Sequence, residues 1–106
     1  MSTKTIGKVT LHQNGGFVAK LQFMYENGSQ WVHLDGSAGI PVAQSVTLDP
    51  GQFGVPNNGN MSVYVFVVWG ADNQGKEVFT YVSGSPNVAE YTIEGTTLSN
   101  KLIYKP

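Results

Sequence analysis

The sequence predicts an all-β protein, an antiparallel two-sheet β-sandwich of about seven or eight strands. Apolar and polar residues alternate with a period of two over most of the chain, as in strands that bury one face. Clusters of Gly, Pro and Asn separate these segments, and no window has the period of an amphipathic helix. Because 106 residues are the size of one domain, we expect residues 1–106 to form a single sandwich.

The first clear strand covers residues 17–26. Its apolar face consists of Phe17, Ala19, Leu21, Phe23 and Tyr25. Asn27-Gly28 follows this strand, and both residue types tolerate the positive φ of a type I′ hairpin turn. We therefore expect a hairpin that joins residues 17–26 to a second strand over residues 30–34.

A third alternating strand covers residues 42–48. Residues 49–60 contain three Gly, two Pro and three Asn, so we expect a connecting loop that Phe53 and Val55 hold against the core. The most hydrophobic segment, residues 61–69, is apolar on both faces. Such a strand is either central in its sheet and covered on both sides, or it presents one face to a partner. After a turn at 72–75, the last strands are expected at 77–82, 88–93 and 98–104.

Charged residues make up only 12% of the chain, about half the usual share, and the net charge is -1. Six Lys and Arg residues are too few for a basic stripe, which argues against binding to nucleic acid or to anionic lipid. Neutral polar residues replace the charges, and they suit hydrogen bonds to neutral partners such as sugars or lipid head groups.

The chain has no cysteine, which excludes disulfides and cysteine-ligated metal. Its start lacks an apolar run of signal-peptide length, and no stretch is long and apolar enough to span a membrane as a helix. We therefore expect cytoplasmic synthesis without a signal peptide, with secretion by a non-classical route left open.

Catalytic motifs are weak in this sequence. His33 and Asp35 lie two residues apart on one strand face, but an isolated pair of this kind is usually solvated, and a metal site needs three or more ligands. No Gly-x-Ser-x-Gly elbow is present, and residues 36–39 lack the lysine of a phosphate-binding loop. We expect a protein that is not an enzyme and that has no cofactor and no metal site.

Two segments carry a resemblance to a known family. Residues 15–19 read Gly-Gly-Phe-Val-Ala and open a strand, and residues 94–98 read Glu-Gly-Thr-Thr-Leu. In order and spacing the chain resembles, from about residue 15 onward, the C-terminal membrane-binding β-sandwich (domain 4) of the cholesterol-dependent cytolysins. The resemblance implies a stand-alone membrane-recognition domain. It also implies that Thr97 and Leu98 match the Thr-Leu pair that touches sterol in that family.

The chain departs from the family pattern in two places. Where the family has a Trp-rich undecapeptide with a Cys, residues 69–76 are polar and slightly shorter, which argues against strong cholesterol-dependent anchoring. Glu94 also stands where the family has Trp.

The candidate ligand-binding residues are Thr96, Thr97, Leu98, Trp31 and Trp69. The threonine hydroxyls can hydrogen-bond a sterol or a sugar while Leu98 contacts its apolar ring; alternatively, Leu98 packs beneath the end of the sandwich. Each Trp either stacks on a ligand or belongs to the core. Trp31 follows a turn, so we expect it to be the more exposed of the two.

The resulting hypothesis is a non-enzymatic recognition module that binds a membrane component, sterol or glycan, through loops at one end of the sandwich. Two alternatives remain open. One is a structural or assembly protein that self-associates through an apolar sheet face or a sheet edge. The other is a toxin component that acts with a separately encoded pore-forming partner.

Overall fold

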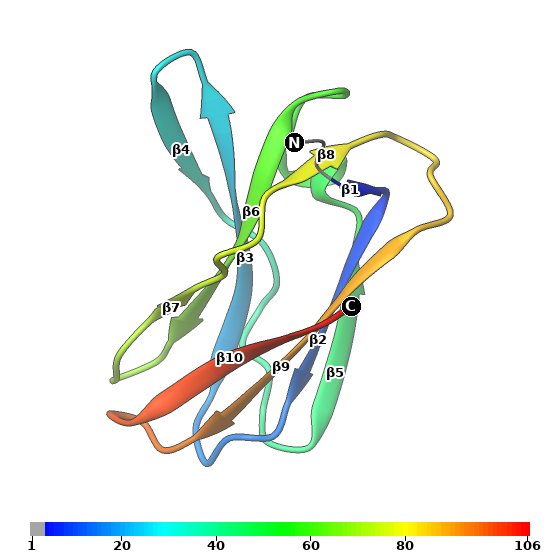
Figure 1. The fold of residues 1–106 in the computed structure, drawn as a ribbon. Coiled ribbons are helices and arrows are strands. Elements are labelled where there is room, and N and C mark those ends of the chain that lie inside the picture. The colour runs from blue at the N-terminus through cyan, green and yellow to red at the C-terminus, as the bar shows by residue number, and fades with distance from the viewer. Residues whose placement is uncertain (1–3) are drawn as a thin grey trace.

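The computed structural model describes residues 4–106, and these residues form two packed β-sheets (Figure 1). Sheet A has the order β1-β8-β6-β3-β4, with β7 paired to β6, and sheet B has the order β10-β9-β2-β5. The strands of sheet A are β1 (Lys4–Ile6), β3 (Ala19–Asn27), β4 (Gln30–Leu34), β6 (Asn60–Val67), β7 (Asn73–Gln74) and β8 (Phe79–Tyr81). Those of sheet B are β2 (Lys8–Gln13), β5 (Gln44–Leu48), β9 (Val88–Gly95) and β10 (Asn100–Lys105). The predicted all-β sandwich is confirmed.

Both sheets are mixed, whereas the sequence pattern suggested purely antiparallel pairing. β1 runs parallel to β8, and β2 runs parallel to β9. The chain passes from sheet A to sheet B at Gly7, where a Cβ atom would lie 2.3 Å from the backbone oxygen of Ser85. The N-terminal strands thus pair with strands from the C-terminal part of the chain, and alternation alone does not reveal such partners.

The core lies between the two sheets and is built from the inward faces of the long strands. On sheet A, Leu21 and Phe23 of β3 pair with Val65 and Val63 of β6. All four of these side chains are fully buried. The other members of the buried core are Ile6, Val9, Leu11, Ala19, Ile40, Val55, Met61, Val67, Phe79, Tyr81, Ala89, Tyr91 and Ile93. The predicted strand over residues 61–69 is therefore central, and it ends at Val67.

The loop at residues 49–60 begins with a short 3-10 helix, η1 (Pro50–Phe53), in which the Asp49 side chain accepts a hydrogen bond from the Gly51 N–H. Phe53 packs against the core with its ring 5.7 Å from that of Phe23, and Val55 is buried. The expectation that these two side chains hold the loop to the core is confirmed.

The predicted hairpin between β3 and β4 is present, but its turn is shifted by one residue. Asn27 pairs with Gln30, so Gly28 and Ser29 form the turn. Gly28 has φ of 65°, whereas Asn27 keeps a negative φ. Gly in the first turn position is typical of a type II′ turn, which replaces the expected type I′ turn.

Four connections gather at one end of the sandwich, the lower end in Figure 1. We call them the tip loops: residues 14–18, 35–43, 68–72 and 96–99. The β3–β4 hairpin projects at the opposite end. Among residues 4–106, no helix is long and apolar enough to cross a membrane.

Candidate functional site

Two of the tip loops, 68–72 and 96–99, are bonded to each other. The Ala71 N–H donates to the Thr97 carbonyl at 2.9 Å. The Asn100 side-chain amide donates to the carbonyl oxygens of Ala71, Thr96 and Thr97 at 3.0, 3.2 and 3.3 Å. One amide at the start of β10 therefore holds both loops in a fixed relation.

Gly70 permits this close contact between the loops. A Cβ atom at this position would lie 2.1 Å from the backbone oxygen of Thr97 and 2.5 Å from its methyl carbon. Both distances are too short for any side chain, so the backbone of loop 68–72 can reach loop 96–99 only because this residue is glycine.

Asp72 closes the β6–β7 connection on itself. One carboxylate oxygen accepts a hydrogen bond from the Val67 N–H at 2.9 Å, and the other accepts one from the Tyr64 hydroxyl at 2.6 Å. The hydrogen bond to Asp72, with burial second, raises the pKa of Tyr64 to about 12. Loop 68–72 is thus tied at both of its ends to β6.

Trp69 projects from this tied loop into solvent. Its side chain is 92% exposed, and its backbone has φ of 61°, in the left-handed region. A bulky residue in that region costs about 1–3 kcal/mol, and such strain persists only where the surrounding bonds impose it. The expectation that Trp31 is the more exposed Trp is wrong, because Trp31 is 39% exposed. The left-handed turn directs Trp69 away from the core, and an alternation pattern does not encode that turn.

Leu98 is 80% exposed at the end of the neighbouring loop. Thr96 contributes its hydroxyl to the turn itself, because it accepts from the Ser99 N–H at 3.1 Å and lies 3.3 Å from the Ser99 carbonyl. Thr97 is half-buried against Gly70. The loop therefore presents Leu98 outward, while the Thr96 hydroxyl is already engaged.

The other two tip loops are joined by the buried amide of Gln13, at the end of β2. Its side chain is fully buried, and it donates to the carbonyls of Phe17 and Ile40, the latter at 3.3 Å. Its oxygen accepts from the Gly15 N–H at 2.6 Å. The exposed side chains on these loops are Val18 and Val42, at 41% and 55%. Each tip loop thus carries one exposed large apolar side chain.

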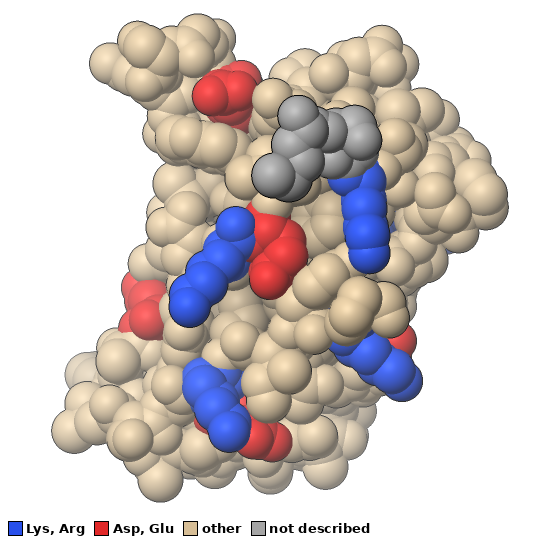
Figure 2. Space-filling model, viewed as in Figure 1, with Lys and Arg blue, Asp and Glu red and all other residues tan. Residues whose placement is uncertain are grey.

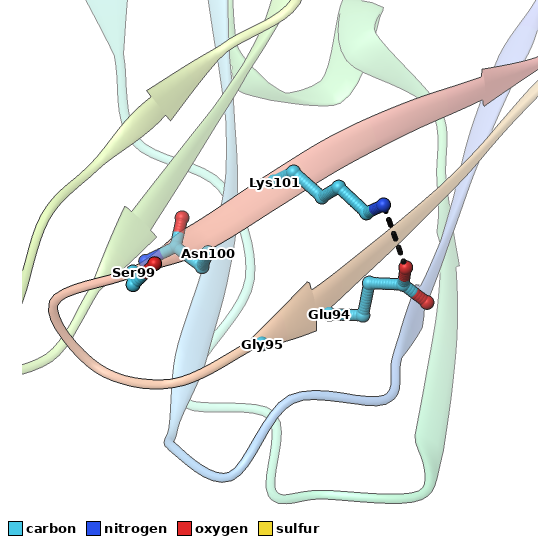
Figure 3. Close-up of a pocket in the computed structure, with 5 residues that line it drawn as sticks. All are labelled: Glu94, Gly95, Ser99, Asn100 and Lys101. Atoms are coloured by element: carbon cyan, nitrogen blue, oxygen red, sulfur yellow. Dashed lines mark ion pairs between the residues drawn. The ribbon is translucent and has the colours of Figure 1, made fainter.

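A shallow pocket of about 320 Å³ lies beside loop 96–99, lined by Glu94, Gly95, Ser99, Asn100 and Lys101 (Figure 3). Glu94 and Lys101 face each other across β9 and β10 with their charged atoms 3.4 Å apart. Figure 2 shows the lysines of one face separated by neutral surface, without a basic stripe. The ion pair neutralises the rim of the pocket, so the tip offers apolar groups rather than net charge.

Trp31 lies apart from the other candidate residues. It belongs to β4 and pairs with Glu26 on the outward face of sheet A, and it lines a different groove together with Ser62 of β6. The structure thus brings Thr96, Thr97, Leu98 and Trp69 together at the tip and separates Trp31 from them.

One polar cluster was missed by the sequence interpretation. On the outer face of sheet B, the two ring nitrogens of His12 lie 2.7 Å from the Ser45 hydroxyl and 2.7 Å from a Glu90 carboxylate oxygen. The hydrogen bond from His12 lowers the pKa of Glu90. The residue types are those of a Ser-His-acid relay, but all three lie on a solvated strand surface, where they tie β5, β2 and β9 together. No local spacing signals this cluster, because its members come from three separated strands.

His33 does not pair with Asp35. Its ring lies 4.2 Å from that of Tyr64, and its Nε2 lies 2.6 Å from the Gln22 side-chain oxygen. Within residues 4–106, no group of three or more His, Asp and Glu side chains is placed to hold a metal ion.

Comparison with known sequences finds no family model and no curated protein that matches the chain. Comparison with solved structures finds similar folds among toxins. A Gram-negative toxin has a TM-score of 0.56 and 21% identity over 94% of this chain. Listeriolysin O has 0.52 and 18% over 93%, and pneumolysin has 0.53 and 17% over 93%.

The matched part is 22–23% of the length of each of those three proteins. Listeriolysin O and pneumolysin are cholesterol-dependent cytolysins, so the resemblance drawn from residues 15–19 and 94–98 is confirmed for the fold.

Proposed function

We propose that this chain is a non-enzymatic module that binds a membrane surface through its tip loops. The observation that carries the proposal is the pair Trp69 and Leu98. They are the two most exposed large apolar side chains among the described residues, at 92% and 80%, and they lie on two loops bonded directly to each other. Exposed apolar side chains gathered at one end mark an interaction surface.

Rigid presentation favours binding at this surface. Asn100, Asp72 and Gln13 hold the tip loops by bonds to backbone groups, so little loop motion would be lost when the tip meets a partner. An indole suits the boundary between lipid head groups and acyl chains, because it is apolar with one polar N–H. Burying Trp69 and Leu98 at that boundary would contribute about 2 kcal/mol for each side chain.

A neutral, sterol-containing membrane fits the chemistry of the tip better than an anionic one. The chain carries a net charge of -1, and the Glu94–Lys101 pair neutralises the rim beside Leu98. The Thr97 hydroxyl next to Leu98 suits a sterol, which has one hydroxyl on a rigid apolar ring system. The fold shared with cytolysins supports the same direction.

The test is co-sedimentation with phosphatidylcholine vesicles prepared with and without cholesterol. We expect binding by the natural chain and a loss of affinity of about a hundredfold in the double variant Trp69→Ala, Leu98→Ala. The matched control is Val88→Ala, because Val88 is 48% exposed but lies at the start of β9, away from the tip. Equal binding by the double variant and the natural chain would refute the proposal, and cholesterol dependence would assign the sterol as the component bound.

A second candidate function is self-association, and the open edges of the two sheets favour it. β6 is enclosed by β3, β7 and β8, so a second copy would have to pair with an edge strand such as β5. Sedimentation velocity of the chain, with and without vesicles, separates the two functions. A stable oligomer that the tip substitutions leave intact would favour assembly, and oligomers only on vesicles would favour membrane binding followed by assembly. A separately encoded pore-forming partner is a further arm of the same vesicle assay.

A further inference from the structure

A second groove lies on the outward face of sheet A, and its residues take no part in the tip. It has a volume of about 490 Å³ and is lined by Trp31, Ser62, Gln74, Gly75, Lys76 and Val78. The residues come from β4, β6, β7 and the connection between β7 and β8. Small-molecule sites in proteins usually have volumes of about 300–1,000 Å³, so this groove has the size of a ligand site.

Ser62 is the most informative residue in the groove. Its side chain is 3% exposed, and its hydroxyl has no hydrogen-bond partner among the described residues. Buried polar groups are almost always bonded, so an orphaned hydroxyl that lines a groove calls for an explanation. A polar ligand in the groove would supply the missing bond.

The remaining polar groups that line the groove are also free. Within residues 4–106, the Gln74 amide makes no side-chain hydrogen bond and the Lys76 ammonium makes no ion pair. Elsewhere on the same sheet face, the polar side chains pair with one another. Those pairs are His33 with Gln22, Tyr64 with Asp72 and Asn60 with Glu26. Unpaired donors are thus concentrated where the groove is.

From this contrast we infer that the groove binds a saccharide. Trp31 is 39% exposed and offers an aromatic surface to the apolar face of a sugar ring. Ser62, Gln74 and Lys76 offer donors to ring and hydroxyl oxygens, and Ser62 and Gln74 also accept from sugar hydroxyls. A phosphate group fits less well, because Lys76 is the single cation in the lining and no helix begins there.

The inference goes beyond the proposed membrane function and is independent of it. The test is an array of immobilised neutral and sialylated glycans without lipid, probed with the labelled natural chain and with Trp31→Ala, Ser62→Ala and Gln74→Ala. We expect the natural chain to bind a subset of glycans, and each substitution to reduce the signal at least tenfold. Ser62→Ala should not lower the thermal midpoint, because it removes an unsatisfied group.

The control on the array is the tip variant Trp69→Ala, Leu98→Ala, which should bind the same glycans with unchanged signal. A Trp69→Phe variant leaves Trp31 as the only Trp, and titration with a free glycan from the array should shift its emission. Absence of glycan binding by the folded natural chain would overturn the inference, as would binding that survives both Trp31→Ala and Gln74→Ala. Because the array holds no lipid and the vesicles hold no sugar, the two proposals can fail separately.

Discussion

The two tryptophans of this chain illustrate how backbone conformation, rather than residue type, decides what a side chain can do. Trp69 is 92% exposed on a loop at the tip, in a left-handed conformation. Trp31 is 39% exposed on a regular strand beside a polar groove. The first is presented to a surface, and the second lies against one. The same side chain therefore serves two different recognition modes in our account.

The rigidity of the tip loops is what distinguishes the two regions, and it can be attacked directly. The largest effect is expected from Gln13→Leu, which leaves the carbonyl oxygens of Phe17 and Ile40 and the Gly15 N–H without their partner. Each buried unsatisfied group costs about 1–3 kcal/mol, so we expect a loss of about 3 kcal/mol or more in urea denaturation. Gln52→Leu, at an exposed position in η1, is the matched control and should change stability little. A Gln13 variant as stable as this control would contradict the role of the buried amide.

A smaller effect is expected where the two bonded loops meet. In Gly70→Ala the new Cβ would collide with the Thr97 backbone oxygen, so the loops must separate. We expect a cost of about 2 kcal/mol and weaker vesicle binding, with glycan binding unchanged. Gly16→Ala is the control, because a Cβ there has its nearest neighbour at 3.9 Å. Loss of glycan binding in Gly70→Ala would show that the two regions are not independent.

The smallest effect is expected from Tyr64→Phe, which frees one oxygen of Asp72 and loosens loop 68–72. We expect a loss of about 1 kcal/mol at neutral pH. The pKa of Tyr64 is raised to about 12 in the folded protein, so its contribution is complete below its unfolded pKa of about 10 and is lost as pH rises through the folded value. Urea denaturation should therefore separate Tyr64→Phe from the natural chain at pH of about 8 but not above about 12. A difference that persists unchanged at high pH would contradict this role of Tyr64.

Local features of the fold were predictable from the sequence, whereas long-range pairing was not. The alternating segments gave the sandwich, because side-chain period reports directly on burial. The turn of the β3–β4 hairpin moved by one residue, since Asn27 and Gly28 both suit a turn and the register across Asn27 and Gln30 decides between them. The parallel pairing of β2 with β9 depends on residues about 80 positions apart in the chain.

The candidate site divided in the same way. Residues 94–98 were singled out by a local motif, and the structure gives Leu98 the exposure that a contact residue needs. The bonds that shape the tip come from Asn100, Asp72 and Gln13, and no motif marks them. Ser62 lies on a strand that reads as uniformly apolar, so its orphaned hydroxyl is visible only once the neighbours in the sheet are known.

The central claim, that Trp69 and not Trp31 meets the membrane, is tested most directly by tryptophan fluorescence in two single-Trp variants. Trp31→Phe leaves only Trp69, and Trp69→Phe leaves only Trp31. Each variant is mixed with vesicles of phosphatidylcholine and cholesterol, with and without bromine-labelled acyl chains that quench nearby indoles. We expect the emission of Trp69 to shift to shorter wavelength and to be quenched by the brominated lipid, while that of Trp31 stays unchanged. Quenching of Trp31 with Trp69 unaffected, or of neither residue, would contradict the account.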